Sequence, residues 1–261
     1  MQNKIQALFT KYNLPKPEGD ILPVAGGLMH KMFKVQTSSG SGAFAVKVLN
    51  SEIMKRPDAA KNYERAEKLE GLLETAGLPI VPALTFDGKK MQEFDGDFFY
   101  IFHWQEGSIT DWNAITKDQC FVAGELLGRM HKIDAQNVEA QVAEECNIDF
   151  EAYIKIATGK TGDDTIAIAS ILSENLSLLK TAQARLNQAR KNLPAMKAIT
   201  DDDMDPNNVM WYKGQPHIID LECLDYGNPI SSCLNLALQW SGTVNQSFNK
   251  ENLTAFYDGY L

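Results

Sequence analysis

The residues between positions 200 and 229 have the types and spacing that phosphoryl transfer requires. Asp203 is followed five residues later by Asn208, and twelve residues further on Asp220 closes the apolar segment 217–219, a predicted strand. One carboxylate can orient a hydroxyl and accept its proton, while an amide oxygen and a second carboxylate can hold metal ions beside nucleotide phosphates. Asp203 is therefore the candidate catalytic base, and Asn208 and Asp220 are the candidate metal ligands.

Each of these three residues also has an ordinary structural explanation. Asp203 suits a turn, Asn208 suits a helix cap, and Asp220 could simply end a buried strand. The order D-x-x-x-x-N followed by a strand-borne aspartate is nevertheless typical of the catalytic and metal loops of kinases. The ordered set is much more specific than any one member, so we favour the functional interpretation.

Lys47 lies within an apolar strand predicted at 44–49. Burying a lone ammonium is costly, so a partner is expected. In kinases such a lysine contacts the α- and β-phosphates of the nucleotide and pairs with a glutamate of the following helix. The helix predicted at 57–76 offers Glu64 and Glu67, and we favour Glu67. A lysine that extends from an edge strand into solvent is the alternative.

Two further segments are candidates for nucleotide binding. Gly26 and Gly27 separate two predicted strands, where glycine lets backbone N–H groups approach phosphates, although an ordinary hairpin turn explains them equally well. Residues His103, Trp104 and Gln105 follow a strand predicted at 98–102, and as a connector between lobes their backbone would bind the purine edge.

The distribution of elements predicts an α+β chain with two lobes. Residues 1–104 alternate short strands with one long helix and predict a small antiparallel sheet, the nucleotide-binding lobe. Residues 105–261 are mainly helical and would form the catalytic and substrate lobe. Helices are predicted at 2–12, 57–76, 116–132, 148–158, 164–193 (as one helix or two) and 230–241, and strands at 21–24, 32–37, 44–49, 83–86 and 98–102.

The composition limits the partners of this chain. It has 261 residues, a net charge of -9, 44% hydrophobic and 23% charged residues. The negative charge argues against nucleic-acid binding and suits a cationic substrate. The sequence lacks an apolar run long enough for a membrane span and an N-terminal signal segment, so we expect a cytoplasmic protein. Its four widely spaced cysteines predict neither disulfides nor a metal site.

Additional carboxylates surround the candidate site. Asp201, Asp202 and Asp205 flank Asp203, and Glu222 follows Asp220 by two residues, so on an extended segment it would point the same way. Metal ions or a cationic ligand would relieve the repulsion among these groups. Solvated turn carboxylates are the alternative.

The chain resembles the aminoglycoside phosphotransferase family, within the protein-kinase-like superfamily that also contains the choline kinases. The resemblance extends over nearly the whole chain. The matching segments are Gly26-Gly27 with Phe33 and Val35, Ala45-Val46-Lys47, Gly77-Leu78-Pro79, Leu127-Gly128 with His131, Asp203-Met204-Asp205-Pro206, Asn207-Asn208-Val209 and Ile219-Asp220.

This resemblance implies a two-lobed kinase fold with ATP or GTP in the cleft. It implies that Lys47 contacts the phosphates, that Asp203 is the catalytic base, and that Asn208 and Asp220 bind Mg²⁺. The family's substrates are small hydroxyl compounds, often cationic, such as aminoglycosides and choline.

Two departures from the family pattern affect the interpretation. Asp201 occupies the position where the family usually has a histidine that supports the metal loop, and its presence either loosens the site, changes metal affinity or is compensated. Leu261 follows Asp220 by 41 residues, whereas many relatives carry additional C-terminal helices that shape the substrate pocket.

Three functional hypotheses follow. The first is an antibiotic kinase that confers resistance, and the second is a metabolic kinase for choline, an amino sugar or another small alcohol. The third is a nucleotide-binding pseudokinase that serves as an interaction module. Asp201 and the short segment after Asp220 favour the third slightly, whereas the complete set of Lys47, Asp203, Asn208 and Asp220 opposes it.

Overall fold

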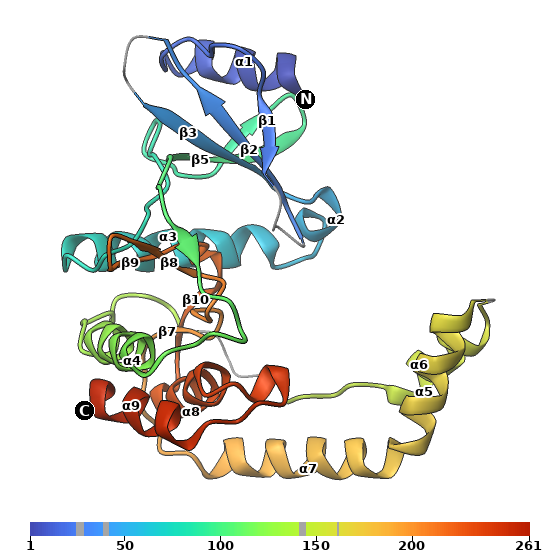
Figure 1. Ribbon diagram of the computed structural model, residues 1–261. Coiled ribbons are helices and arrows are strands. Elements are labelled where there is room, and N and C mark those ends of the chain that lie inside the picture. Colours follow the sequence, from blue (N-terminus) through green and yellow to red (C-terminus); the bar gives the residue numbers. More distant parts are fainter. Residues whose placement is uncertain (25–28, 39–41, 141–144, 161) are drawn as a thin grey trace. The chain divides into compact units, whose positions relative to one another are not determined.

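The computed structural model describes residues 1–24, 29–38, 42–140, 145–160 and 162–261. The chain divides into two compact units (Figure 1). One comprises Met1–Ala140 with Lys197–Leu261, and the other comprises Gln141–Met196. The lobe boundary predicted after residue 104 falls inside the first unit and stays a prediction.

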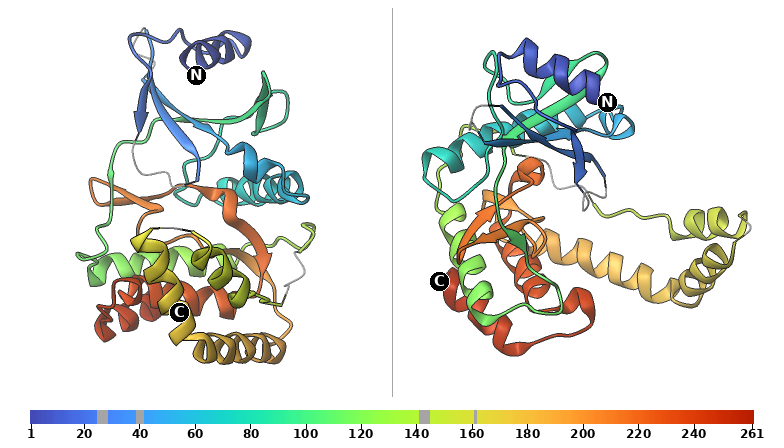
Figure 2. Two further views of the ribbon diagram at one scale, coloured as in Figure 1. Left: turned by 90° about the vertical axis from the view of Figure 1, so that its right-hand side faces the viewer. Right: turned by 45° about the horizontal axis from the view of Figure 1, so that its top comes forward.

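An antiparallel five-stranded sheet forms the N-terminal part of the first unit (Figure 2). Its strands follow the order β1-β2-β3-β5-β4. Their bounds are β1 Leu22–Val24, β2 Lys31–Gln36, β3 Ala43–Val48, β4 Gln92–Phe94 and β5 Asp97–His103. The strands predicted near β1, β2, β3 and β5 are confirmed, and β4 was not predicted. The strand predicted at 83–86 is wrong: Ala83 makes a single bridge to Phe102, since its N–H donates to Glu70 Oε1 at 2.7 Å.

Two helices accompany this sheet. Helix α1, Gln2–Lys11, buries Ile5, Leu8 and Phe9 against the sheet residues Val46 and Phe99. The predicted helix after β3 is confirmed as α3, Ala59–Thr75, which follows the short α2, Ser51–Met54. Apolar residues at helical spacing thus favour the formation of both α1 and α3, because one face of each helix can be buried.

Three helices form the core of the C-terminal part: α4 Lys117–His131, α8 Pro229–Trp240 and α9 Lys250–Tyr260. Helices α4 and α9 lie side by side (Figure 2). A Cβ atom added to Gly124 of α4 would lie 2.0 Å from the carbonyl oxygen of Phe256, so glycine is required for this approach. His131 Nδ1 lies 2.8 Å from the Tyr260 hydroxyl at the same interface. Helix α9 was not predicted.

Short strands flank the turns that contain Asp203, Asn208 and Asp220. Strand β7, Ala198–Asp201, pairs with β10, Leu224–Gly227. A second small sheet has the order β6-β8-β9, with β6 Ser108–Ile109, β8 Val209–Tyr212 and β9 Gln215–Ile218. The 3₁₀ helices are η1, Leu221–Cys223, and η2, Thr243–Asn245.

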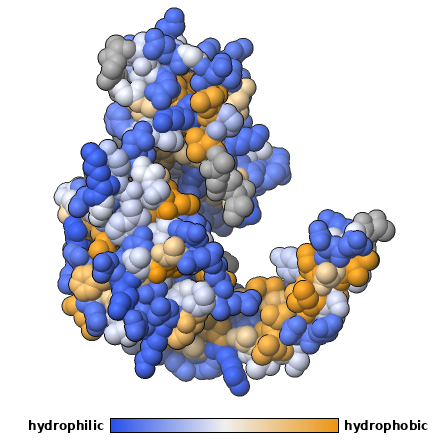
Figure 3. Space-filling model, viewed as in Figure 1, coloured by the Kyte–Doolittle hydropathy of each residue, from blue (hydrophilic) through white to orange (hydrophobic). Residues whose placement is uncertain are grey.

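The second unit consists of α5 Phe150–Thr158, α6 Asp163–Glu174 and α7 Leu176–Asn192. The long helix predicted at 164–193 is split at Asn175. Several large apolar side chains of these helices are exposed (Figure 3). They are Tyr153, Ile156, Ile166, Ile168, Ile171, Leu178 and Leu186. This unit therefore has little core of its own.

Within the described ranges, none of the helices combines the length and apolar character needed to cross a membrane.

Candidate active site

The candidate base Asp203 lies in the turn that follows β7. Its backbone N–H donates to Asp201 Oδ1 at 3.2 Å, and the N–H of Met204 donates to the Asp201 carbonyl at 3.2 Å. The carbonyl of Met204 accepts a bond from the buried Trp240 indole at 2.9 Å. The turn is therefore attached to both β7 and α8, which fixes the backbone that carries Asp203.

Asn208 folds back onto the same turn. Its side-chain Nδ2 donates to the Asp203 carbonyl at 2.8 Å, and its backbone carbonyl accepts from Ile219 N at 2.9 Å. The amide nitrogen is thus committed to the turn, and Oδ1 is the atom with which Asn208 would bind a metal. The bond to Ile219 places Asn208 beside the segment that carries Asp220.

Asp220 does not close an extended strand, as the sequence suggested. Strand β9 ends at Ile218, and Asp220 has a left-handed conformation with φ 62° and ψ 53°, immediately before η1. The expectation that Glu222 follows on an extended segment is therefore wrong. The turn of η1 still directs both carboxylates to one place, because both contact Lys47.

Lys47 is buried in β3, and its partners differ from the one we predicted. The Nζ atom lies 2.5 Å from Asp220 Oδ1 and also contacts Glu222 Oε2. Glu67 instead accepts bonds from the backbone N–H of Met91 at 2.8 Å and from the hydroxyl of Tyr100 at 2.9 Å. Glu67 therefore anchors the segment before β4, and the predicted Lys47–Glu67 pair is not the one that the structure contains.

The site holds an excess of negative charge. Burial raises the pKa of Asp203 to about 6, and the charges of Asp205, Asp220 and Glu222 add to the increase. Burial also raises the pKa of Asp220, although Lys47 opposes it. For Glu222, burial acts in the same direction, but the hydrogen bond from His30 and the charge of Lys47 hold its pKa at about 2. Asp220 and Glu222 thus share a single ammonium group.

These residues fit a divalent cation. Repulsion among carboxylates around one ammonium is relieved by a further positive charge. Across the ranges that the structure describes, no group of three or more His, Cys, Asp or Glu side chains could hold a metal alone. Mg²⁺ is usually held by one or two carboxylates together with substrate phosphates, so Asn208 and Asp220 would be an ordinary protein contribution.

Some of the residues predicted to bind the nucleotide lie within the described part of the chain, and two do not. Gly26 and Gly27 lie outside the described residues. His103 ends β5, and Trp104 follows it with its backbone N–H bonded to the Ala43 carbonyl at 2.9 Å. Gln105 donates from Nε2 to the Glu106 carbonyl. The Trp104 N–H is therefore already hydrogen-bonded to β3. Contact of His103, Trp104 and Gln105 with a purine stays a prediction.

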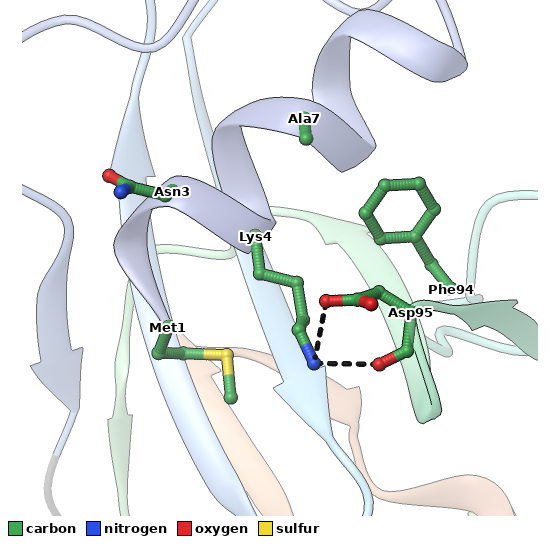
Figure 4. Close-up of a pocket in the computed structure, with 6 residues that line it drawn as sticks. All are labelled: Met1, Asn3, Lys4, Ala7, Phe94 and Asp95. Atoms are coloured by element: carbon green, nitrogen blue, oxygen red, sulfur yellow. Dashed lines mark hydrogen bonds and ion pairs between the residues drawn. The ribbon is translucent and has the colours of Figure 1, made fainter.

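Two cavities of the first unit differ in their relation to the site. One, of about 640 Å³, is lined by Met1, Asn3, Lys4, Ala7, Phe94 and Asp95 (Figure 4). Its cation, Lys4, is already paired with Asp95 and Asp97 at 3.2 and 2.5 Å, and it contains none of the motif residues. The other is water-sized, about 10 Å³, and borders both Glu67 and Glu222.

His30 is a residue of the site that the sequence analysis missed. Its Nε2 lies 2.8 Å from Glu222 Oε1. The residues around His30 do not predict a role for it, because its partner Glu222 lies 192 positions away in the sequence.

The sheet, the helical C-terminal part and the assembled loop define a protein-kinase-like α+β fold, which confirms the predicted fold class. A family model described as the phosphotransferase enzyme family matches residues 20–260. The chain therefore belongs to this family of small-molecule kinases, and the predicted resemblance is confirmed. The search of curated proteins finds no match.

Solved structures support the fold. Spectinomycin phosphotransferase APH(9)-Ia, in complex with ADP and spectinomycin, is 13% identical with a TM-score of 0.75, covering 100% of this chain and 79% of that chain. Amicoumacin kinase hAmiN, in complex with AMP-PNP and Ca²⁺, is 11% identical with a TM-score of 0.68, covering 99% and 77%. Choline kinase from Cryptosporidium parvum Iowa II is 14% identical with a TM-score of 0.57, covering 98% and 78%.

Proposed function

We propose that this enzyme transfers the γ-phosphoryl group of ATP to a hydroxyl of a small cationic compound. The observation that supports this most is the assembly of Lys47, Asp203, Asn208 and Asp220 through two adjoining loops and one strand. The Asn208 bonds to Asp203 and Ile219 and the 2.5 Å contact of Lys47 with Asp220 bring the four together. Two of the similar structures contain ADP or AMP-PNP, which supports ATP as the donor.

Each residue has a defined task in this proposal. Lys47 would bind the nucleotide phosphates, and Asn208 and Asp220 would hold Mg²⁺, which would neutralise phosphate charge. Asp203 orients the acceptor hydroxyl and accepts its proton at the carboxylate. The bond between the γ-phosphorus and the ADP oxygen breaks, a bond to the acceptor oxygen forms, and ADP leaves.

A cationic acceptor is favoured by the charge around Asp203. Asp205 lies two residues from it in sequence, and the charges of Asp205, Asp220 and Glu222 act on its pKa. An ammonium group near the hydroxyl would be attracted to these carboxylates. Aminoglycosides, choline and amino sugars all have this chemistry.

ADP formation with each acceptor class, in Mg²⁺ and in a chelator, tests the proposal. We expect one class to stimulate turnover, and we expect Asp203→Asn to reduce that turnover by about 10²–10⁴-fold, the usual contribution of a general base. The matched control is Asp202→Asn, an adjacent carboxylate of the same turn. ATP binding without turnover of any compound would favour the pseudokinase, and full activity of Asp203→Asn would refute the assigned base.

A further inference from the structure

Glu222 joins two basic side chains of the N-terminal sheet region. Its Oε2 contacts Lys47 Nζ, and its Oε1 lies 2.8 Å from His30 Nε2. The three side chains are only 13%, 6% and 7% exposed, respectively. Both carboxylate oxygens of Glu222 are thus occupied inside the protein, so this glutamate is held in one orientation.

His30 is itself oriented by the backbone. Its Nδ1 accepts a hydrogen bond from Asn50 N at 3.0 Å, so its proton lies on Nε2 and is donated to Glu222. Asn50 in turn caps α2, because its Oδ1 accepts from Glu52 N at 2.9 Å. A continuous set of hydrogen bonds therefore extends from the start of α2 through His30 to the carboxylate that contacts Lys47.

The glutamate that would ordinarily hold this lysine is committed elsewhere. Glu67 accepts bonds from Met91 N and the Tyr100 hydroxyl. A water-sized cavity borders Glu67 and Glu222. The Lys47 ammonium group contacts Asp220 and Glu222 instead. Asp220 is the residue proposed to bind the metal, which leaves Glu222 as the carboxylate that can stay on Lys47.

We propose that Glu222 and His30 position Lys47 for the nucleotide phosphates. In kinases this task is performed by a glutamate of the helix that follows the lysine-bearing strand. This inference rests on the proposed function. A buried ammonium that keeps one ordered carboxylate stays charged and oriented, whereas an unpaired one is strongly disfavoured. Glu222 and His30 are positioning residues, since they act on the nucleotide through Lys47.

Nucleotide affinity in the absence of metal tests this assignment. We would titrate ATP in a chelator by calorimetry, using Glu222→Gln, His30→Ala and the matched variant Glu67→Gln. We expect Glu222→Gln and His30→Ala to weaken ATP binding about 10-fold, which corresponds to about 1.4 kcal/mol, and Glu67→Gln to change it less than about threefold. In turnover assays the KM for ATP should rise more than kcat falls.

A second variant keeps the test informative if His30→Ala or Glu222→Gln is poorly folded. His30→Gln retains an N–H donor, so it should recover part of the ATP affinity, and thermal unfolding of each variant checks the fold. The proposal is overturned if Glu67→Gln weakens binding and Glu222→Gln does not. It is also overturned if Glu222→Gln acts only when Mg²⁺ is present and His30→Ala has no effect, since Glu222 would then be a metal ligand.

The two proposals can fail separately. Wild-type protein that binds ATP but phosphorylates no acceptor contradicts the proposed function, while the variants still decide the role of Glu222. Wild-type protein that does not bind ATP contradicts both.

Discussion

The carboxyl group of Asp201 accepts a hydrogen bond from the backbone N–H of Asp203, with 3.2 Å between the two atoms. Asp201 is fully buried, and its Oδ2 has no hydrogen-bond partner among the residues that the structure describes. Burial, together with the charges of Asp203 and Asp220, raises the pKa of Asp201 well above its usual value. A raised pKa favours the protonated, neutral form of this buried carboxyl. Asp201 stands where the family usually has a histidine. Its bond to Asp203 N supports the interpretation that Asp201 compensates for the absence of that histidine.

Neutral substitution of Asp201 should be tolerated. Asp201→Asn keeps the acceptor for Asp203 N and needs no proton, so activity should stay within about threefold of wild type. Asp201→Ala leaves that N–H without its partner, which should reduce the free energy of unfolding by about 1–3 kcal/mol. Chemical denaturation and turnover measurements check both. Equal stability of the two variants would contradict the assigned bond.

The pH dependence of stability provides a separate test of the Asp201 proton. A carboxyl whose folded-state pKa is raised contributes stability that is present below its unfolded value, and this contribution is lost as pH rises through the folded pKa. Asp201→Asn lacks this loss, so its melting temperature relative to wild type should increase from pH 4 to pH 8. A difference that is independent of pH would show that Asp201 is not protonated in the folded state.

The activity should depend on ionisation of Asp203. Its pKa is raised to about 6, and the base must be deprotonated, so kcat/KM should rise with pH through about 6 and then level off. Asp205→Asn removes one of the charges that raise this pKa and retains the oxygen that accepts from Asn207 N at 2.7 Å. We therefore expect kcat/KM of Asp205→Asn to rise at a lower pH than that of the wild type. An unshifted profile would exclude Asp203 as the titrating group.

The α4–α9 contact should be sensitive to a single methyl group. A Cβ at Gly124 would lie 2.0 Å from Phe256 O and 3.0 Å from Tyr260 N, so the helices must separate. Overpacking of this kind should lower the free energy of unfolding of Gly124→Ala by about 1–3 kcal/mol or more. The matched control is Gly71→Ala in α3, where a Cβ meets nothing within 4 Å. Alanine there should stabilise by up to about 1 kcal/mol, as thermal denaturation can measure.

Helices α5 to α7 should open more readily than the first unit. Their buried residues are Phe150, Ala157 and Ala169, and α7 buries none. Few buried contacts mean a small free energy of local opening. Hydrogen exchange followed by mass spectrometry should therefore show faster exchange in α5–α7 than in α4. Equal protection of α4 and α7 would contradict this expectation.

Local sequence patterns determined much of the fold and part of the site. Apolar residues at helical spacing predicted α1, α3 and α4, because a helix is stabilised by burying one face. Asp203 and Asn208 are joined within one turn, so their spacing alone predicted that they lie together. Helix α9 was missed, because its position depends on a contact between Phe256 and Gly124 of α4, which lie far apart in the sequence.

Only the tertiary structure decided which carboxylates meet Lys47. Asp220 and Glu222 lie 173 and 175 residues from Lys47 in the chain. Their approach depends on the left-handed conformation of Asp220 and on the 3₁₀ turn that follows it. The sequence contained Glu67 at a suitable spacing, but spacing cannot show that backbone N–H groups and a tyrosine hydroxyl already occupy its carboxylate. Pairing between distant side chains is set by packing of the whole unit, whereas periodicity and turn spacing are local properties of the sequence.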